Sequence, residues 1–274
     1  MKLLNGKELA GFIKERQAQQ VRSLKQASNI VPRLAIIRTN PDPVVDTYMR
    51  LKSQYGEDIG VPVDVHTVLQ PEALKRIEQL NTDPQVSGII VQIPLPDPSQ
   101  TDTILSAVTP QKDVDGLAAN TIYDAPTPIA ISWLLAGYNV ELNGKRIVIV
   151  GHGRLVGSPL LKMWQASNYD VAVADKSTAD LAALTLGADV VVTATGKPGL
   201  ITSAMVKEGA VIVDAGVATD KNGLAGDVAP DLRQRPDITI TPENGGVGPL
   251  TVCALFDNVI RAARAQAGNA ATSS

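Results

Sequence analysis

Two side chains that can exchange protons, Tyr48 and Lys52, stand four residues apart in the segment DTYMRLK. This spacing puts both on one face of a helix, and residues 46–60 have the pattern of a helix that ends at Gly60. A lysine acts as a general base only where its surroundings lower its pKa toward neutrality. By themselves the two residues fit a solvated helix face better than an acid/base pair, so the choice depends on partners elsewhere in the chain.

Three further segments contain residues that can act as such partners. Gln92 stands in the apolar strand SGIIVQIPLP, residues 87–96, where an amide can also simply face water. KDVDG, residues 112–116, offers two carboxylates at alternate positions, a composition shared with solvated and Asx turns. GGVGPLT, residues 245–251, is harder to interpret as a plain turn, because glycines cost conformational entropy and are used where backbone must approach another group.

A glycine-rich loop, GHGRLVG, follows the apolar strand RIVIV and opens an apolar helix. Glycines at 151, 153 and 157 permit a tight turn and a close backbone approach, and a helix N-terminus favours a pyrophosphate. The spacing is one residue longer than the usual dinucleotide fingerprint, and such a loop alone is weak evidence. Its position between a strand and a helix favours nucleotide binding over a plain turn.

The next strand ends at Asp175, where a Rossmann-type site places the acid that binds the ribose 2′-hydroxyl of NAD. Lys176, Ser177 and His152 lie close in sequence and are able to hold the 2′-phosphate of NADP, so both nucleotides stay open. Gly196, in ATGKPGLI, follows a later strand, at the sheet edge where open α/β folds bind ligands. A glycine there lets backbone approach the nicotinamide or its ribose.

Strands and helices alternate along the chain, which predicts two α/β units with mainly parallel sheets and a junction near residues 117–127. Helices are expected at 5–27, 46–60, 71–80, 129–137, 160–164 and 252–265. Strands are expected at 34–38, 62–69, 87–96, 146–150, 169–174, 189–195, 210–216 and 238–241. The small, polar tail 266–274 is expected to be disordered.

Composition narrows the classes of partner. The chain has 25 basic and 28 acidic residues among 274, a formal charge of −3, which gives no electrostatic reason to expect nucleic acid or a membrane surface. Aromatic residues, at 3%, are too sparse for a base-stacking surface. One cysteine, Cys253, excludes a disulfide framework, and the two histidines lack ligand spacing, so we expect no metal. Without a signal peptide pattern at the start or an apolar membrane span, we expect a cytoplasmic protein.

The motifs together resemble one family. YMRLK, GIIVQIPLP, KDVDGL, GHGRLVGSP, TGKPGLI and GGVGPLT occur in the order and at the spacings of the methylenetetrahydrofolate dehydrogenase/methenyltetrahydrofolate cyclohydrolase family, from about residue 5 to 262. The resemblance implies an N-terminal catalytic domain, residues 1–120, completed by a C-terminal helix at 252–265. It also implies a Rossmann-type nucleotide-binding domain at 121–251, a folate cleft between the domains, and a homodimer.

The resemblance also assigns roles to residues. It implies that Lys52 is the acid/base of the hydrolysis, that Tyr48 stacks on and orients the folate, that Gln92 tunes the lysine and that Asp115 grips the pterin. Further folate contacts are implied for Gly246, Val247 and Pro249. Nucleotide contacts are implied for Gly151, His152, Gly153, Gly157 and Val217, to which the sequence adds Asp175, Lys176 and Gly196.

The implied activity is the oxidation of 5,10-methylene-tetrahydrofolate and the hydrolysis of the methenyl product to 10-formyl-tetrahydrofolate, in one-carbon metabolism and purine biosynthesis. NADP is the family's usual cofactor, and NAD stays possible because of Asp175. A dehydrogenase without hydrolysis is a second reading, because Val45 and Gln54 differ from the usual neighbours of the lysine. A non-catalytic folate- or nucleotide-binding module is a third, because a fold alone does not prove chemistry.

Overall fold

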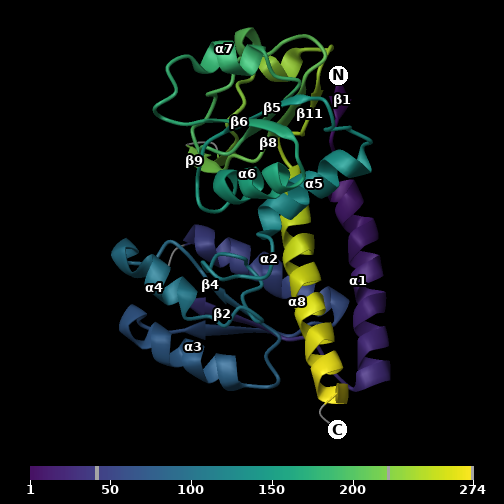
Figure 1. Cartoon of the computed structure of the whole chain (residues 1–274), viewed down its shortest axis with the longest axis vertical. Helices are drawn as coiled ribbons and strands as arrows, with labels where there is room; N and C mark the ends of the chain where they lie inside the picture. The colour runs from purple at the N-terminus through teal and green to yellow at the C-terminus, as the bar shows by residue number, and fades with distance from the viewer. Residues whose placement is uncertain (41–42, 221–222, 273–274) are drawn as a thin grey trace. The chain divides into compact units, whose positions relative to one another are not determined.

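The computed structural model describes residues 1–40, 43–220 and 223–272 (Figure 1). It divides into two compact units, each made from separate stretches of chain. One consists of Met1–Ala10 and Thr127–Thr251, and the other of Gly11–Pro126 and Val252–Ser274. We name them the six-stranded unit and the three-stranded unit after their sheets.

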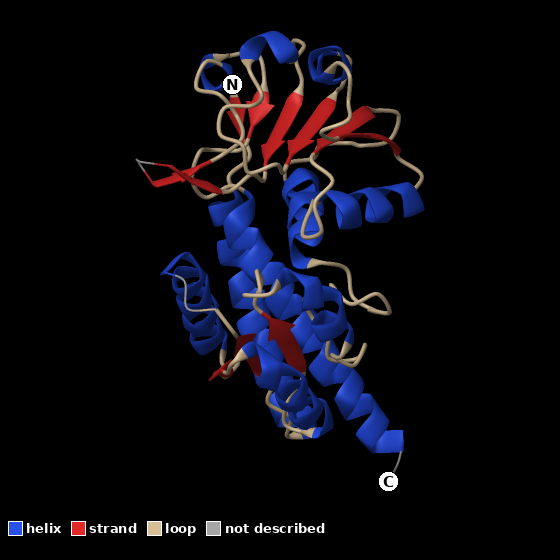
Figure 2. Ribbon diagram, turned by 90° about the vertical axis from the view of Figure 1, so that its left-hand side faces the viewer, coloured by secondary structure: helices blue, strands red, loops and turns tan. Residues whose placement is uncertain are grey.

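The three-stranded unit is built on a parallel sheet in the order β3-β2-β4. Figure 2 draws the strands in red and the helices in blue. Its strands are β2 (Leu34–Arg38), β3 (Val63–Thr67) and β4 (Gly88–Val91). The apolar runs LAIIR and GIIV are buried because both faces of β2 and β4 are covered, as parallel sheets require. The edge strand β3 is only partly buried and carries polar residues.

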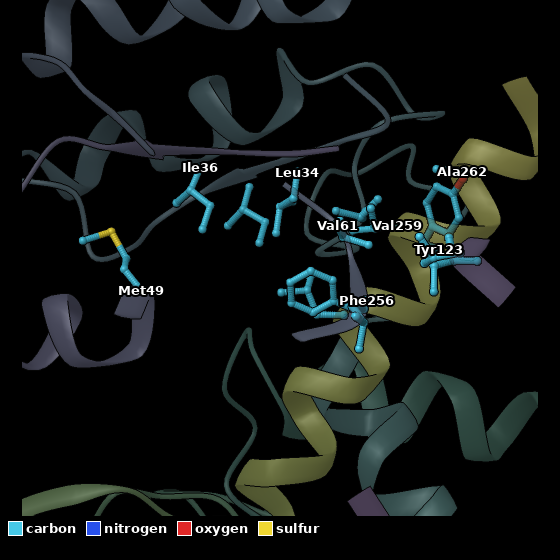
Figure 3. Close-up of a cluster of buried hydrophobic side chains, with 14 residues drawn as sticks. Leu34, Ile36, Met49, Val61, Tyr123, Phe256, Val259 and Ala262 are labelled. Atoms are coloured by element: carbon cyan, nitrogen blue, oxygen red, sulfur yellow. The ribbon is translucent and has the colours of Figure 1, made fainter. Parts of the chain in front are cut away.

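Helices cover both faces of this sheet. They are α1 (Gly6–Ser28), α2 (Pro43–Ile59), α3 (Ala73–Thr82), α4 (Thr101–Ser106) and α8 (Val247–Thr272). Alternate side chains of β2 point to opposite faces. Leu34 and Ile36 pack with Phe256 of α8 and Met49 of α2 (Figure 3). On the other face Ala35 and Ile37 belong to a second core with α3 and α4, which contribute Ala73, Ile77, Leu80, Ile104 and Leu105.

Helix α8 is longer than the sequence predicted. It begins at Val247, so GGVGPLT is a helix start in which Pro249 occupies the first turn, where a missing N–H is tolerated. It continues to Thr272, whereas the tail 266–274 was expected to be disordered; residues 273–274 lie outside the described chain. The extension has two causes: an alanine-rich sequence favours helix, and Gln266 binds the segment just before β4. Gln266 Nε2 donates to the Val86 carbonyl at 3.0 Å, and its Oε1 accepts from Ser87 Oγ at 3.0 Å.

The six-stranded unit holds a wholly parallel sheet in the order β1-β11-β8-β7-β5-β6. Its strands are β1 (Lys2–Leu3), β5 (Arg146–Val150), β6 (Asp170–Ala174), β7 (Val190–Thr193), β8 (Val211–Asp214) and β11 (Thr239–Ile240). Its helices are α5 (Pro126–Gly137), α6 (Gly157–Ala166) and α7 (Leu181–Leu186). An antiparallel pair, β9 (Ala218–Asp220) and β10 (Gly223–Ala225), follows β8. Short 3-10 turns occupy Gln70–Glu72, Pro98–Gln100, Ser203–Met205 and Leu232–Gln234.

Strand β1 pairs with β11, Lys2 opposite Thr239, so the first ten residues fold with the six-stranded unit. The sequence grouped these residues with the N-terminal unit. A strand of two residues carries no readable periodicity, and its partner lies near the other end of the chain, so no local pattern reveals the pairing. Between β6 and β7 the chain crosses from one side of β5 to the other. Ligands bind open α/β sheets at such a switch point.

Candidate active site

The structure brings together three of the residues singled out from the sequence. Lys52 lies on α2, Gln92 directly follows β4, and Asp115 lies in the KDVDG segment. Lys52 Nζ donates to Gln92 Oε1 at 3.2 Å, and the Asp115 carboxylate acts electrostatically on the amine. Gln92 Nε2 donates to the Ile93 carbonyl at 3.1 Å, and this contact orients the amide with its oxygen toward the lysine.

Burial shifts the pKa values of Lys52 and Asp115 in the directions that favour the neutral form of each side chain. It lowers the pKa of the Lys52 amine, an effect that Asp115 opposes. Burial also raises the pKa of the Asp115 carboxyl; Lys52 opposes this effect and Asp113 adds to it. The Lys52 amine, next to the uncharged acceptor Gln92, therefore loses its proton at a lower pH than the amine of a free lysine. A general base must be neutral in this way to accept a proton.

Tyr48 lies one helical turn before Lys52 on α2 and is half-buried. Burial raises the pKa of its phenol, so the ring stays protonated and uncharged at neutral pH. It therefore offers an aromatic face and a hydroxyl donor rather than a base. Gln54 donates instead to Asp58 Oδ1 at 3.0 Å on the exposed side of the helix. The side chain of Val45 lies outside the described residues.

In the KDVDG segment, Lys112 and Asp113 hold the backbone in place and Asp115 acts on Lys52. Lys112 is buried and donates to the carbonyls of Leu80 at 2.9 Å and Asp83 at 2.6 Å. Asp113 Oδ2 accepts from the Ala118 N–H at 3.0 Å. These contacts fix the backbone on both sides of Asp115, whose carboxylate is left to act on Lys52.

Two residues that complete this support were not identified from the sequence. Gly116 adopts a φ of 66°, and a Cβ there would lie 2.7 Å from the Tyr123 carbonyl, so only glycine fits. Asn258 of α8 is fully buried, and its Nδ2 donates to the Val114 carbonyl at 2.9 Å and the Asp124 carbonyl at 3.0 Å. The available signal was one amide inside the otherwise apolar segment CALFDNVI, and it gives no hint of the partners.

In the six-stranded unit the glycine-rich loop is tightly folded. Gly151 has a φ of 103°, and a Cβ on Gly157 would lie 1.8 Å from the Gly151 carbonyl oxygen. Helix α6 begins at Gly157 and has no side-chain cap. The Ser158 N–H donates to the Gly153 carbonyl at 3.0 Å and Pro159 has no N–H. The helix therefore offers an anion its dipole and fewer N–H groups than the sequence suggested.

Asp175 directly follows β6 and is exposed. Its Oδ1 accepts from the Ser177 N–H at 2.8 Å and from Ser177 Oγ at 2.5 Å. These bonds hold the pKa of the carboxyl below its usual range, and His152 of the glycine-rich loop adds to the effect. An ionised carboxylate and an imidazole thus stand near each other at the ends of β5 and β6, with Lys176 between Asp175 and Ser177 in the chain.

Loops after β7 and β8 complete this edge of the sheet. A Cβ on Gly151 would lie 2.6 Å from the Ala194 carbonyl oxygen, so the loops after β5 and β7 touch. Gly196 has a φ of 66°, and a Cβ built on it would lie 3.4 Å from the Val217 carbonyl oxygen. Val217 itself is 56% exposed. The structure therefore collects Gly151, Gly196 and Val217 at the switch point.

Gly246, Val247 and Pro249 lie at the start of α8, in the six-stranded unit. The Lys7 N–H donates to the Gly245 carbonyl at 2.9 Å, and a Cβ on Gly6 would lie 1.8 Å from the Gly246 carbonyl oxygen. Gly245 has a φ of 83°, and a Cβ on Gly246 would lie 3.0 Å from the Thr241 Cβ, so backbone conformation and packing account for these two glycines without a ligand. Gly248, by contrast, has open space around it.

Residues 1–40, 43–220 and 223–272 contain no group of three or more His, Cys, Asp or Glu side chains able to hold a metal ion. Over the same stretches, no helix is long and apolar enough to cross a membrane.

Comparison with known proteins gives matches along nearly the whole chain. Residues 4–115 match the catalytic domain of tetrahydrofolate dehydrogenase/cyclohydrolase, and residues 125–267 match its NAD(P)-binding domain. The chain is 37% identical to the bifunctional protein FolD of Sulfurovum sp., over 97% of this chain and all of that one.

Solved structures agree with these matches. The Campylobacter jejuni bifunctional enzyme FolD, a methylenetetrahydrofolate dehydrogenase/cyclohydrolase, has a TM-score of 0.92 at 34% identity and covers 97% of this chain and 99% of its own. A Trypanosoma brucei enzyme of the same name, complexed with NADP and an inhibitor, has a TM-score of 0.89 at 28% identity and covers 96% and 97%. The chain belongs to the tetrahydrofolate dehydrogenase/cyclohydrolase family.

Proposed function

We propose that this chain oxidises 5,10-methylene-tetrahydrofolate with NADP⁺ and hydrolyses the resulting 5,10-methenyl-tetrahydrofolate to 10-formyl-tetrahydrofolate. The observation that carries the hydrolysis is the contact of Lys52 Nζ with Gln92 Oε1 at 3.2 Å, combined with the lowered pKa of the amine. The observation that supports the oxidation is the glycine-rich loop at the switch point of a parallel sheet.

The residues at that edge fit a dinucleotide. The Gly151 carbonyl oxygen occupies the space that a Cβ on Gly157 would need, so the turn is tight. A tight turn without side chains lets the main chain approach a diphosphate closely. Ionised Asp175 suits a ribose hydroxyl, while His152 and Lys176 suit a 2′-phosphate. The Trypanosoma brucei relative is complexed with NADP, and we propose NADP as the cofactor here, with NAD also accepted.

The oxidation asks little of side chains. Bound NADP⁺ supplies the hydride acceptor, and the lone pairs of the folate nitrogens stabilise the methenyl cation that remains. The chain must hold the folate in place, a task we assign to Tyr48 and Asp115, with Gly246, Val247 and Pro249 as further contacts.

The hydrolysis moves protons, and here Lys52 is the proposed acid/base. Water adds to the methenyl carbon as the neutral amine takes one of its protons. The bond from that carbon to N5 then breaks as the Lys52 ammonium returns its proton to N5. The added hydroxyl loses its own proton, and the carbon remains on N10 as the formyl group. One proton is released overall. Gln92 holds the amine without adding a negative charge, which would raise the pKa of the amine.

The wild-type protein tests this function directly. Given methylene-tetrahydrofolate and NADP⁺, it should produce the absorbance of the methenyl compound and of NADPH, and added methenyl-tetrahydrofolate should disappear faster than in buffer. A protein that forms no methenyl product with either nucleotide is not the proposed dehydrogenase. One that oxidises but never hydrolyses is a monofunctional dehydrogenase, and saturable binding without turnover marks a binding module.

Nucleotide preference should depend on Asp175. Replacing it with serine removes a charge that repels a 2′-phosphate and an acceptor for the 2′-hydroxyl of NAD. We expect the ratio of kcat/KM for NADP⁺ to that for NAD⁺ to rise about tenfold. Asp170→Ser, at the other end of β6, serves as the matched control and should leave the ratio as it is. An unchanged ratio in Asp175→Ser would show that the carboxylate does not read the ribose.

We propose further that the protein acts as a homodimer in the cytoplasm. Light scattering of the purified chain should give twice the mass of 28.9 kDa. A monomeric mass at assay concentration would contradict the dimer.

A further inference from the structure

The six-stranded unit contains a fully buried carboxylate, Asp227, that the proposed chemistry does not use. Its Oδ2 accepts from Thr193 Oγ1 at 2.7 Å and from the Thr195 N–H at 2.6 Å. Its Oδ1 accepts from the Lys197 N–H at 2.9 Å. Two of the three donors are backbone groups on either side of Gly196, so Asp227 binds the main chain of the loop after β7 and fixes its conformation.

A second buried carboxylate, Asp214 at the end of β8, fixes Asp227 in turn. Asp214 Oδ1 accepts from the Asp227 N–H at 3.0 Å and from the Gly216 N–H at 3.1 Å. Its Oδ2 accepts from Arg233 at 2.7 Å and from the Val228 N–H at 3.2 Å. The Arg233 guanidinium balances the charge of Asp214. Because Asp214 is the last residue of β8, its hydrogen bonds fix the backbone around Asp227 to the end of β8, from which the chain continues to Val217.

Two glycines are required for this arrangement. A Cβ on Gly216 would lie 2.2 Å from the Asp227 carboxyl carbon, and a Cβ on Gly226 would lie 2.1 Å from Asp214 Oδ2. Each carboxylate therefore lies against a glycine in the segment that holds the other. Any larger residue at 216 must displace Asp227 from the loop it grips.

The gripped loop is not part of the core. Gly196, Lys197 and Pro198 are exposed, whereas Asp227 and Thr193 are fully buried. Burying a carboxylate is costly unless its hydrogen bonds are satisfied. Here that cost serves to hold an exposed turn in one conformation at the switch point, as preorganised binding sites require.

We propose that Asp227 is a positioning residue for the nicotinamide side of the nucleotide site. By fixing the N–H groups of Thr195 and Lys197, it sets the conformation of the turn at Gly196 and its spacing from Val217. This inference rests on the proposed function and on the sequence prediction that backbone at Gly196 approaches the nicotinamide or its ribose. Asp227 itself does not touch the reacting atoms.

The test is Asp227→Asn, measured by direct titration of NADPH fluorescence and by the KM for NADP⁺. The amide keeps one acceptor oxygen and turns an NH₂ group toward a donor, so at least one loop contact is lost. We expect the nucleotide Kd and KM to rise about tenfold or more, with the rate of methenyl hydrolysis within about twofold of wild type. Unchanged nucleotide affinity overturns the proposal.

Asp189→Asn is the matched control. Asp189 precedes β7 at its opposite end and accepts from the Arg146 N–H at 2.8 Å and from Lys207 Nζ at 2.7 Å. It should lower the thermal midpoint without changing nucleotide affinity. If Asp227→Asn behaves like this control, or loses binding and hydrolysis together, its role is structural and the proposal fails.

Gly216→Ala gives an independent arm. The added methyl group displaces the Asp227 carboxylate and should raise the nucleotide Kd as Asp227→Asn does. In an Asp227→Ala background the methyl group enters the space that the carboxylate left, so it should raise the Kd little further. Full additivity of the two changes would contradict the arrangement. Should Asp227→Asn not fold, Thr193→Val removes one donor at constant size, and an unchanged nucleotide Kd in that variant overturns the proposal.

Direct titration separates this inference from the proposed function. A wild-type protein that binds NADPH but turns over no folate contradicts the function and leaves the role of Asp227 testable by binding. A wild-type protein that turns over folate while Asp227→Asn binds NADPH normally contradicts only the inference. A wild-type protein that does not bind NADPH contradicts both.

Discussion

Lys52→Met is expected to abolish hydrolysis of 5,10-methenyl-tetrahydrofolate while hydride transfer remains measurable. Methionine keeps a long, flexible side chain but cannot take a proton from water, and a positioned acid/base contributes about 10²- to 10⁴-fold in rate. We therefore expect hydrolysis to fall by about that factor. The loss of methenyl absorbance, followed without nucleotide, measures it.

Lys75→Met is the matched control, because Lys75 is an exposed lysine on α3 of the same unit. It should change neither activity. A Lys52→Met protein that hydrolyses at the wild-type rate would remove Lys52 from the mechanism and return the pair of Tyr48 and Lys52 to an ordinary helix face.

The pH dependence of hydrolysis should carry the same signature. Burial lowers the pKa of the Lys52 amine and Asp115 raises it, so the rate should rise with pH through a value below 10.5, the ordinary pKa of lysine. Asp115→Asn removes the carboxylate that favours the cation and should move this rise to lower pH. An unmoved profile in Asp115→Asn would show that the two groups do not interact.

The same shift has a consequence for stability. Because the folded-state pKa of Lys52 is below the unfolded value, the unfolded chain binds more protons, and stability rises with pH between the two values. The cost of burying the amine is absent above the unfolded pKa and grows as pH falls toward the folded one. Lys52→Met should therefore be at least as stable as wild type at neutral pH, and chemical denaturation measures this.

Gly157→Ala is expected to remove most of the dehydrogenase activity and leave hydrolysis intact. The new Cβ would lie 1.8 Å from the Gly151 carbonyl oxygen, so the glycine-rich loop must open. Displacing a binding element by about 1 Å costs about 10²-fold, and we expect nucleotide affinity to fall by at least that factor. NADPH titration measures the loss, and hydrolysis in the same sample reports on folding.

Gly11→Ala provides the control for the Gly157 change. A Cβ on Gly11, in α1, meets nothing within 4 Å. The substitution should stabilise the helix by about 0.5–1 kcal/mol and leave nucleotide binding unchanged. Wild-type nucleotide affinity in Gly157→Ala would mean that the close turn is not part of the site.

The sequence predicted the two-unit α/β architecture, and its uniform apolar runs predicted β2 and β5 with the bounds that the structure gives them. Buried parallel strands are visible in this way because every residue in these two strands except the terminal arginine, Arg38 or Arg146, is apolar. The short helices α4 and α7, of six residues each, were missed because they contain too few turns to display a period.

The site was less accessible from the sequence. Tyr48 and Lys52 were identifiable as a pair, but their connection to Gln92 and Asp115 came from the resemblance to the family. Asn258 and Asp227 could not be recognised as functional supports, because their partners are mainly backbone groups of distant segments. Such contacts depend on the tertiary fold and leave no spacing in the chain.

The pairing of β1 with β11 has a consequence for how the protein is made. The N-terminal strand must wait for residues 239–240 before it finds its partner, and the face of β2 that carries Leu34 and Ile36 must wait for Phe256 of α8. Neither unit is complete until the last part of the chain has left the ribosome. Early in synthesis the apolar face of β2 is thus open to chaperones and to other nascent chains.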